Sequence, residues 1–332
     1  MIRVALLVAA LGLPVEAASR DVAIVGDGVT RACTLLKPDG VANPPAVILV
    51  SGSGPQDRDE TIRGSKPFLR IATHLAREGI ASLRCDDRGV GGSTGSKDAT
   101  LAEEAGDLRR ALAFLCGTDG LDHRRIGVLG HSMGGVVLSL AAAETHPAFA
   151  VLLAAPAVKI GDLLRMQTAT RLKLNGVPAS RIEINDQVIA ALTQASLYGD
   201  ATLRVEAERL ARDLGGNETW VDQKVVFFGS RMFRSFLDHD MAAYRDLSMP
   251  ALALFGGTDW KVDAGTNADA LRALALPALT VITLDDHNHL FQRTAEGRPL
   301  SATGPAPSTE TLDQLSAWIT ATPPAKPCED VR

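Results

Sequence analysis

Short, continuous apolar runs recur along the chain and constrain its fold more than any other feature. They are rich in Val, Ile and Leu and lack polar alternation, which is typical of strands buried on both faces. Segments with helical apolar spacing separate them, such as Lys66 to Glu78. The pattern predicts an α/β protein with a mostly parallel central sheet flanked by helices. The runs lie at residues 46–50, 80–85, 125–130, 149–155, 251–256 and 279–284.

The alternation of strands and helices is interrupted once. About ninety residues with helical periodicity separate the strand that ends near Ala155 from the one that starts at Ala251, far more than a crossover needs. We interpret this insertion as a helical cap. Residues 21–36 contain two β runs joined by a Gly-Asp-Gly turn, which predicts an antiparallel hairpin at the sheet edge. The expected divisions are a signal peptide at 1–17, a first core segment at 18–156, the cap at 157–247, a second core segment at 248–322 and a tail at 323–332.

The N-terminal residues and the overall charge bear on the protein's localisation and on the partners that it is not expected to bind. Arg3 precedes an apolar run from Val4 to Leu13 that is too short to span a bilayer, and small residues suit cleavage after Ala17. We expect a secretory signal peptide and export to the periplasm or the exterior; a buried N-terminal strand or helix is the alternative. The net charge is -5 with scattered Lys and Arg, which argues against nucleic acid and anionic membrane surfaces, and no later stretch reaches the length needed for stable membrane insertion. The oligomeric state stays open.

Four cysteines carry limited information. None of Cys33, Cys85, Cys116 and Cys328 has C-x-x-C spacing, which argues against a metal or dithiol redox site. In an exported protein they could oxidise, and three full pairings are possible. We expect buried free thiols or one structural disulfide.

Two serines satisfy the pattern G-x-S-x-G. Ser132 lies in GHSMG, directly between a buried strand and a helical pattern, which is the context of a nucleophile elbow. Ser93 lies in GGSTG, where a long polar loop separates the strand from the next helix, so it is interpreted as a turn residue. The loop GVGGSTG also approaches a dinucleotide fingerprint, but Thr94 replaces the third glycine. An NAD(P)-dependent oxidoreductase is therefore a remote alternative.

A nucleophilic serine needs an imidazole and a carboxylate that follow it in the order acid, then histidine. Asp259 comes directly after the strand 251–256, whereas Asp263 lies farther from its end. His287 and His289 both follow the strand 279–284, and position alone favours neither. The order and placement predict Asp259 as the acid and one of these two histidines as the base.

Two backbone amides should stabilise an oxyanion next to the serine. The elbow supplies the amide of Met133, and the loop after the strand 46–50 supplies a second one, assigned to Ser53 with Gly52 as the alternative. We expect Asp57, Arg58 and Asp59 to form ion pairs that shape this loop. The chain has no H-E-x-x-H motif, phosphate-binding loop or metal-ligand cluster, so we expect no metal and no cofactor.

Taken together, residues 45–295 resemble the α/β-hydrolase superfamily, and more narrowly bacterial cap-bearing serine esterases. The motifs that carry the resemblance are GSGPQDRD, DDRGVGGSTG, GHSMGG, MFRSFLDHD, GGTD and NHLFQ. The resemblance implies the α/β-hydrolase fold, selects His289 over His287 and supports Asp259. It implies a carboxylesterase for short or medium acyl chains, although Met133 stands where relatives often have an acidic residue.

The expected reaction is ester hydrolysis through an acyl-enzyme on Ser132, His289 and Asp259, acting on a small-molecule ester. A thioesterase, acyltransferase or small peptidase with the same triad is the alternative. Half of the aromatic residues lie in the predicted cap, where most would form its core. Phe233 or Phe236 is expected to face the substrate.

Overall fold

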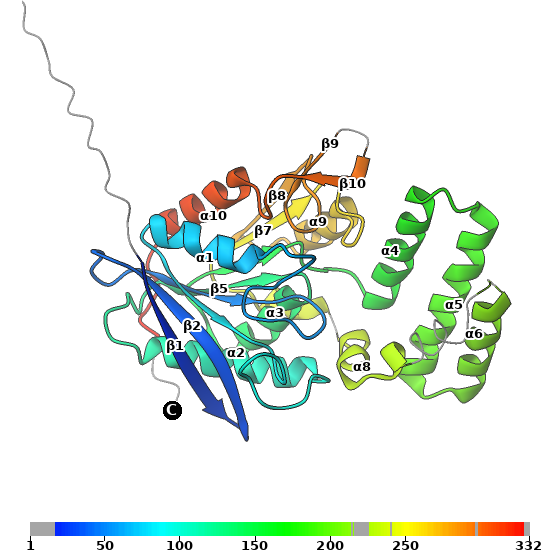
Figure 1. The fold of residues 1–332 in the computed structure, drawn as a ribbon, viewed down its shortest axis with the longest axis horizontal. Coiled ribbons are helices and arrows are strands. Elements are labelled where there is room, and N and C mark those ends of the chain that lie inside the picture. Colours follow the sequence, from blue (N-terminus) through cyan, green and yellow to red (C-terminus); the bar gives the residue numbers. More distant parts are fainter. Residues whose placement is uncertain (1–16, 214, 216–225, 240, 296–297, 329–332) are drawn as a thin grey trace, which may run out of the picture.

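The computed structural model describes residues 17–213, 215, 226–239, 241–295 and 298–328, without the side chains of 298–303. Its centre is an eight-stranded sheet in the order β1-β2-β4-β3-β5-β6-β7-β8 (Figure 1). The strands are β1 (Ala17–Gly26), β2 (Val29–Pro38), β3 (Ala46–Val50), β4 (Ala81–Cys85), β5 (Ile126–His131), β6 (Ala150–Leu153), β7 (Ala251–Gly256) and β8 (Leu279–Leu284). Strands β3 to β8 pair in parallel, as the continuous apolar runs predict.

The N-terminal hairpin lies at one edge of the sheet, where the sequence places it. Strands β1 and β2 pair antiparallel, and β2 then pairs antiparallel with β4. Asp27 and Gly28 connect them with φ values of 49° and 72°, as a two-residue hairpin turn requires. Residues 1–16 of the predicted signal peptide lie outside the described residues.

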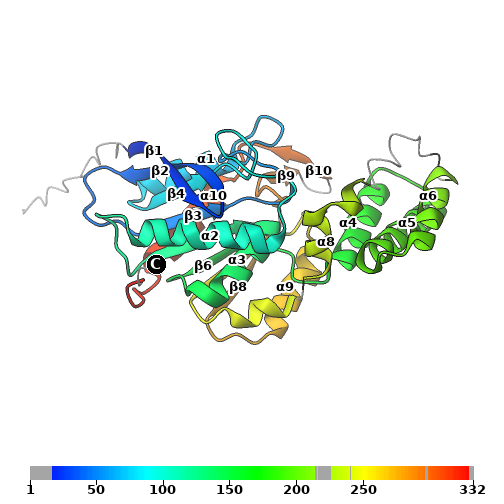
Figure 2. The same cartoon turned by 90° about the horizontal axis from the view of Figure 1, so that it is seen from below.

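Helices cover both faces of the sheet, and Figure 2 shows α2 and α3 together on one of them. Val47 and Leu49 of β3 pack with α1 and α10, whereas Ile48 between them packs with α2 and α3 on the opposite face. Successive side chains of a strand point to opposite faces, so each parallel strand needs apolar residues at every position. The covering helices are α1 (Pro67–Arg77), α2 (Leu101–Cys116), α3 (Met133–Thr145), α9 (Ala264–Ala273) and α10 (Thr309–Ala321).

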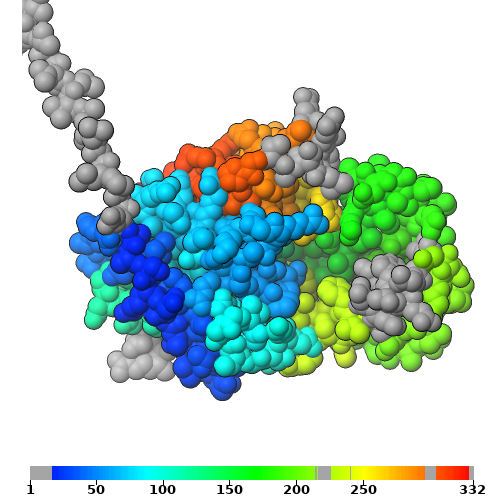
Figure 3. All heavy atoms as spheres, in the orientation of Figure 1, coloured from blue at the N-terminus to red at the C-terminus, as the bar shows by residue number. Residues whose placement is uncertain are grey.

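The segment between β6 and β7 is helical in its described part and lies beside the sheet (Figure 1). Figure 3 shows α4, α5 and α6 as a lobe beyond the carboxyl ends of the parallel strands, with α8 between that lobe and the core. These helices occupy the residues for which the sequence predicts a cap. They are α4 (Ile160–Leu174), α5 (Ala179–Tyr198), α6 (Ala201–Asp213), α8 (Arg231–Leu237) and the short 3-10 helix η1 (Met241–Asp246).

All four cysteines form disulfides, which differs from the single bridge or free thiols expected from the sequence. Cys33 bonds to Cys85 across the β2–β4 pair, where the two residues stand directly opposite each other. Cys116 at the end of α2 bonds to Cys328. The second bridge and the hydrogen bond from Cys328 N to His123 O attach the C-terminal segment to the core.

Some elements were not anticipated. Helix α9 follows the loop that contains Asp259, and a small hairpin of β9 (Arg293–Ala295) and β10 (Arg298–Thr303) follows His289. Both elements follow polar loops, and each contains too few apolar residues to show the repeat of a helix or a strand. Among the described helices, none is long and apolar enough to cross a membrane.

Candidate active site

Ser132 stands at the tip of a sharp turn between β5 and α3. Its backbone has φ 53° and ψ -123°, a conformation that residues other than glycine rarely adopt. A side chain at Gly130 would collide with the backbone of Gly134, and one at Gly134 would collide with the carbonyl oxygen of Val50. The two glycines therefore let α3 start directly against the ends of β3 and β5, with Ser132 held above them.

Asp259 and His289 meet at the carboxyl ends of β7 and β8. Nδ1 of His289 lies 2.7 Å from Oδ2 of Asp259, and both residues are buried. The other carboxylate oxygen, Oδ1, accepts hydrogen bonds from the amides of Lys261 and Val262 at 2.7 and 3.0 Å. Asp259 is thereby fixed, and it orients the imidazole so that Nε2 is left for a substrate or a nucleophile.

The competing residues have structural partners of their own. Asp263 caps α9 by accepting the amide proton of Thr266. His287 is fully buried, with Nε2 2.8 Å from the Ser308 hydroxyl. Within the described part of the chain, neither side chain forms a hydrogen bond or ion pair with Ser132, Asp259 or His289.

Ser93 and its glycine-rich loop also have structural partners. The Ser93 hydroxyl donates to Asp86 O and accepts from Ala32 N. The amides of Gly92 and Thr94 donate to Asp86 and Thr30, so these two groups of the loop are used within the protein rather than left for a pyrophosphate. Ser93 is therefore a turn residue that fixes the loop to β2.

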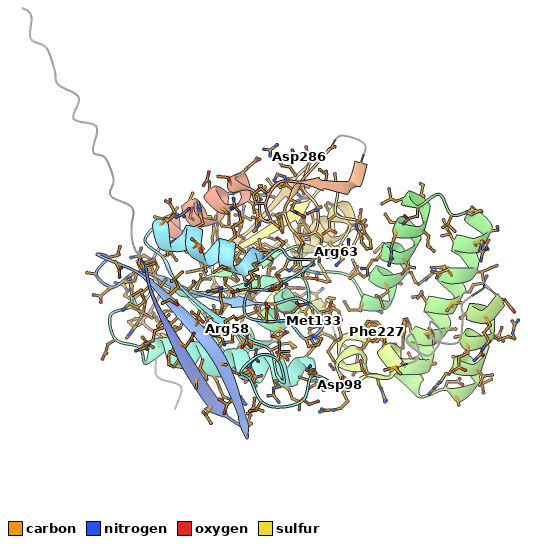
Figure 4. The ribbon with its side chains drawn as sticks, in the orientation of Figure 1. Arg58, Arg63, Asp98, Met133, Phe227 and Asp286 are labelled. Carbon is orange, nitrogen blue, oxygen red and sulfur yellow. A yellow bond between two sulfur atoms is a disulfide. The ribbon has the colours of Figure 1, made fainter. Side chains whose placement is uncertain are left out.

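A cavity of about 160 Å³ lies between the core and the inserted helices. Residues of the candidate site line it on the core side, and residues of α4 and α8 line it on the other side. Figure 4 shows Met133 on the core side and Phe227 on the side of α8. Most of the lining is apolar, which suits the burial of an acyl chain. The lining residues are Ser53, Ser132, Met133, Pro156, Ile160, Leu163, Leu164, Gln167, Phe227, Met232, Phe233, Phe236, Lys261, Val262 and His289.

The predicted oxyanion donors differ in their availability. Among the described residues, the amides of Ser53 and Met133 have no hydrogen-bond partner, and both residues line the cavity. The amide of Gly52 instead donates to Oε1 of Glu60 at 2.9 Å, and Gly52 does not line the cavity. Gly52 is therefore engaged in the loop itself, and of the three candidate amides those of Ser53 and Met133 have no partner in the described part of the chain.

A buried pair behind this loop was not predicted from the sequence. Oε1 of Glu60 lies 2.7 Å from Nδ1 of His131, the residue before the serine, and Nε2 of His131 lies 3.0 Å from the carbonyl oxygen of His289. The pair thus connects the loop of Gly52, the elbow and the histidine loop. His131 could have been noticed because it lies in the motif GHSMG. The sequence around Glu60 does not distinguish it from the neighbouring acidic residues Asp57 and Asp59.

Ion pairs hold the rest of the β3–α1 loop, as expected for its charged residues. Arg58 contacts Asp86 at 2.8 Å, and Asp59 contacts Arg84. Asp57 does not pair with a cation in this way; it accepts the amide protons of Asp59 and Thr61. The loop that carries Ser53 is therefore held to β4 and the residue after it by the ion pairs Arg84–Asp59 and Arg58–Asp86.

Burial and neighbouring charges shift the pKa values in opposite directions at the two histidines. Burial lowers the pKa of His289; Asp259 opposes this shift, and the positive charges of His131 and Lys261 add to it. Burial also acts to lower the pKa of His131, but Glu60, the carbonyl of His289 and Asp259 together outweigh it and the pKa is raised. His289 is therefore kept neutral and able to accept a proton near neutral pH.

Comparison with known proteins finds a related esterase. Esterase EstD of Thermotoga maritima is 29% identical over 257 residues, which are 76% of this chain and 56% of that esterase. The chain thus spans little more than half of the length of this relative.

Solved structures with the same fold are more distant in sequence. Esterase Pf2001 of Pyrococcus furiosus superposes with a TM-score of 0.56 and 16% identity over 92% of this chain and 91% of that one. The α/β hydrolase GrgF from Penicillium superposes with a TM-score of 0.52 and 18% identity, covering 83% of this chain and 91% of its own. These likenesses establish the α/β-hydrolase fold. A family model described as serine aminopeptidase, S33, matches residues 62–293, and the chain belongs to this α/β-hydrolase family.

Proposed function

We propose that the protein hydrolyses carboxylic esters through an acyl-enzyme, with Ser132 as nucleophile, His289 as general base and Asp259 as the orienting acid. The observation that carries the proposal is the buried contact between Asp259 and His289 beside the same cavity that Ser132 lines. The strained backbone at Ser132 supports it, because such strain is typical of a nucleophile elbow.

In this mechanism the Ser132 oxygen attacks the ester carbonyl while Nε2 of His289 accepts its proton. The amides of Ser53 and Met133 donate to the oxyanion, and each such donor typically lowers the barrier by about 3 kcal/mol. The alcohol leaves with the proton from His289. Water then attacks the acyl-enzyme through the same base, which releases the acid and restores the serine.

The cavity favours esters of short to medium acyl chains. The described lining is mostly aliphatic and aromatic, including Phe233 and Phe236 from α8. Burial of apolar acyl surface there contributes about 25 cal/mol per Å². A volume of about 160 Å³ limits the length of chain that fits without movement of the helices.

Aminopeptidase activity is the second candidate, because it is the activity in the family's description. Such an enzyme must bind the α-ammonium group of a peptide, for which a carboxylate is the usual partner. Apart from His289, however, the charged side chain among the described lining residues is that of Lys261. A cation in this place repels an ammonium group, so the cavity supports an ester over a peptide.

The two disulfides bear on where the protein acts. Structural disulfides persist in oxidising compartments and are rare in the reducing cytosol. The bridges Cys33–Cys85 and Cys116–Cys328 therefore support our proposal that the protein is exported to the periplasm or the exterior.

A fluorophosphonate probe and two substrate series test the proposed reaction. The probe should label the protein, and labelling should disappear in Ser132→Ala but persist in Ser93→Ala, provided that both variants show the melting profile of the wild type. The p-nitrophenyl esters of increasing chain length should be cleaved, and amino-acid p-nitroanilides should not. Labelling that survives in Ser132→Ala refutes the assigned nucleophile, and faster cleavage of the anilides identifies an aminopeptidase.

A further inference from the structure

One charged side chain in the cavity has no role in the proposed triad. Lys261 lines the cavity together with Ser132 and His289, and it is only partly exposed. Its amide holds Asp259, but this contact uses the backbone and would be the same for any residue except proline. The presence of an ammonium group therefore needs a separate explanation.

Lys261 has no carboxylate partner within ion-pair distance among the described residues. Burial lowers its pKa, and Asp259 and Glu60, the two carboxylates that oppose this, are both occupied. Asp259 is bonded to His289, and Glu60 to His131. A lysine held in an apolar cavity without a partner is costly unless another anion compensates for its charge.

Two arginines add to the positive charge around Lys261. Arg63 and Arg171 both act to lower the pKa of Lys261, so they lie within electrostatic reach of it. The guanidinium of Arg171 and the ammonium of Lys261 each stand about 6 Å from the centre of the Trp260 ring, at 5.8 and 5.9 Å. Figure 4 shows Arg63 on the side of the core that faces α4, the helix of Arg171.

Neither arginine is neutralised within the described part of the chain, where both are exposed and form no ion pair. This contrasts with the other arginines near the site, such as Arg58 and Arg84, which contact carboxylates. The chain as a whole carries a net charge of -5, whereas Lys261, Arg63 and Arg171 bring three positive charges to this part of the molecule. Such a concentration of one sign beside a low-dielectric cavity attracts and orients an anion.

The position of Lys261 also couples this charge to the chemistry. Its positive charge lowers the pKa of His289 and thus disfavours the imidazolium that forms when Ser132 attacks. An anion bound to Lys261 would reduce this repulsion at the moment when the imidazolium develops. A substrate that brings its own negative charge should therefore be processed faster than a neutral one of the same shape.

We propose that the natural substrates are esters that carry a second, ionised carboxylate, which Lys261 binds with support from Arg63 and Arg171. This inference rests on the proposed ester hydrolysis and names its substrate class. The apolar residues of the cavity then bind the hydrocarbon part of the ester, and the cations bind the acid group.

Two matched pairs of esters test the proposal in either orientation. For an acid on the acyl side, mono-p-nitrophenyl glutarate is compared with p-nitrophenyl hexanoate. For an acid on the alcohol side, p-acetoxybenzoate is compared with its methyl ester, and acetate release is measured for both. The quantity of interest is the ratio of kcat/KM for the anionic and the neutral member, because effects on Ser132 or His289 cancel in it.

The wild type should favour the anionic member of at least one pair, and added NaCl should reduce this preference. Lys261→Met should lower the ratio at least tenfold, Arg171→Gln and Arg63→Gln each less, and Lys261→Arg should retain most of it. Arg209→Gln is the matched control, because it removes one positive charge from the exposed surface of α6, where Arg209 pairs with Glu206. Glutarate should also inhibit hydrolysis of the neutral ester in the wild type, about tenfold more strongly than in Lys261→Met.

Ratios in Lys261→Met that stay within twofold of the wild type, while neutral esters are still cleaved, overturn the inference and leave the proposed function intact. Equal loss in Arg209→Gln also overturns it, because the preference would then reflect overall charge. Absence of both ester cleavage and Ser132 labelling overturns the proposed function, and the inference with it. If Lys261→Met fails to fold, the ratio is measured in Lys261→Gln instead. A ratio in that variant within twofold of the wild type, or absence of inhibition of the wild type by glutarate, then overturns the inference.

Discussion

Replacement of Glu60 offers the sharpest test of how the site is held together. Glu60 is 1% exposed, and its Oε1 accepts from Gly52 N and lies against His131 Nδ1. Glu60→Ala leaves both groups buried without a partner, at about 1–3 kcal/mol each, and should lower the free energy of unfolding by about 3–5 kcal/mol. Glu60→Gln keeps the shape and one acceptor, and should cost about 1–2 kcal/mol.

The loss should depend on pH, because the pKa of His131 is raised above 6.5 mainly by Glu60 against the effect of burial. A raised folded-state pKa gives stabilisation that is complete below the unfolded value and is lost as the pH rises through the folded value. The stability difference between the wild type and Glu60→Gln should therefore be larger at pH 6 than at pH 9. Taking the difference cancels groups that titrate alike in both proteins.

Urea unfolding at the two pH values, followed by tryptophan fluorescence, measures the stability difference. A steady-state assay with p-nitrophenyl butyrate measures activity, and we expect kcat/KM to fall about tenfold in Glu60→Gln, because the loop of Ser53 and the backbone of His289 lose a common support. A difference that is the same at pH 6 and pH 9 would refute the assignment of His131 as the titrating partner. An alanine variant that loses less than about 1 kcal/mol would refute the buried pair as a structural support.

Three further predictions concern the proposed triad and the disulfides. Asp259→Asn should leave the fold intact but lower kcat by roughly 10⁴-fold, because an amide does not favour the required tautomer of His289; a loss below tenfold in the ester assay argues against this role. Since burial and Lys261 lower the pKa of His289, the acidic limb of kcat/KM should have its midpoint below 6.5, and a midpoint above 7 in a pH–rate profile contradicts the assignment. The double variant Cys116→Ser, Cys328→Ser should lose about 2–4 kcal/mol of stability in urea with little change in activity, and an unchanged midpoint would show that the C-terminal segment stays attached without the bridge.

Much of the fold was predictable because its signals are local. Each parallel strand was marked by an apolar run, and β3, β7 and β8 have the bounds that the runs predicted. Ser132 could be separated from Ser93 because an elbow needs a strand and a helix immediately on either side of it. The helical insertion between β6 and β7 was visible because its length exceeds what a crossover requires.

The tertiary structure decided what depends on residues far apart in the chain. His287 and His289 are two positions apart in one loop, and position alone left both open; the structure turns one toward Asp259 and the other toward Ser308. The pairing of the four cysteines likewise follows from which strands and segments become neighbours. Sequence order holds no information on such distances.

The sequence by itself thus determined where the parallel strands lie along the chain, the sharp turn at Ser132 and the place of Asp259 directly after β7, because hydrophobic periodicity and turn chemistry act over a few residues. Only the tertiary structure decided that Glu60 supports His131 and that Lys261 shares a cavity with Ser132 while lacking a carboxylate partner among the described residues. The physical reason is that burial, hydrogen-bond partners and unbalanced charge are properties of groups brought together by folding, and a single charged letter in the sequence looks the same whether it is solvated, paired or held in a cavity.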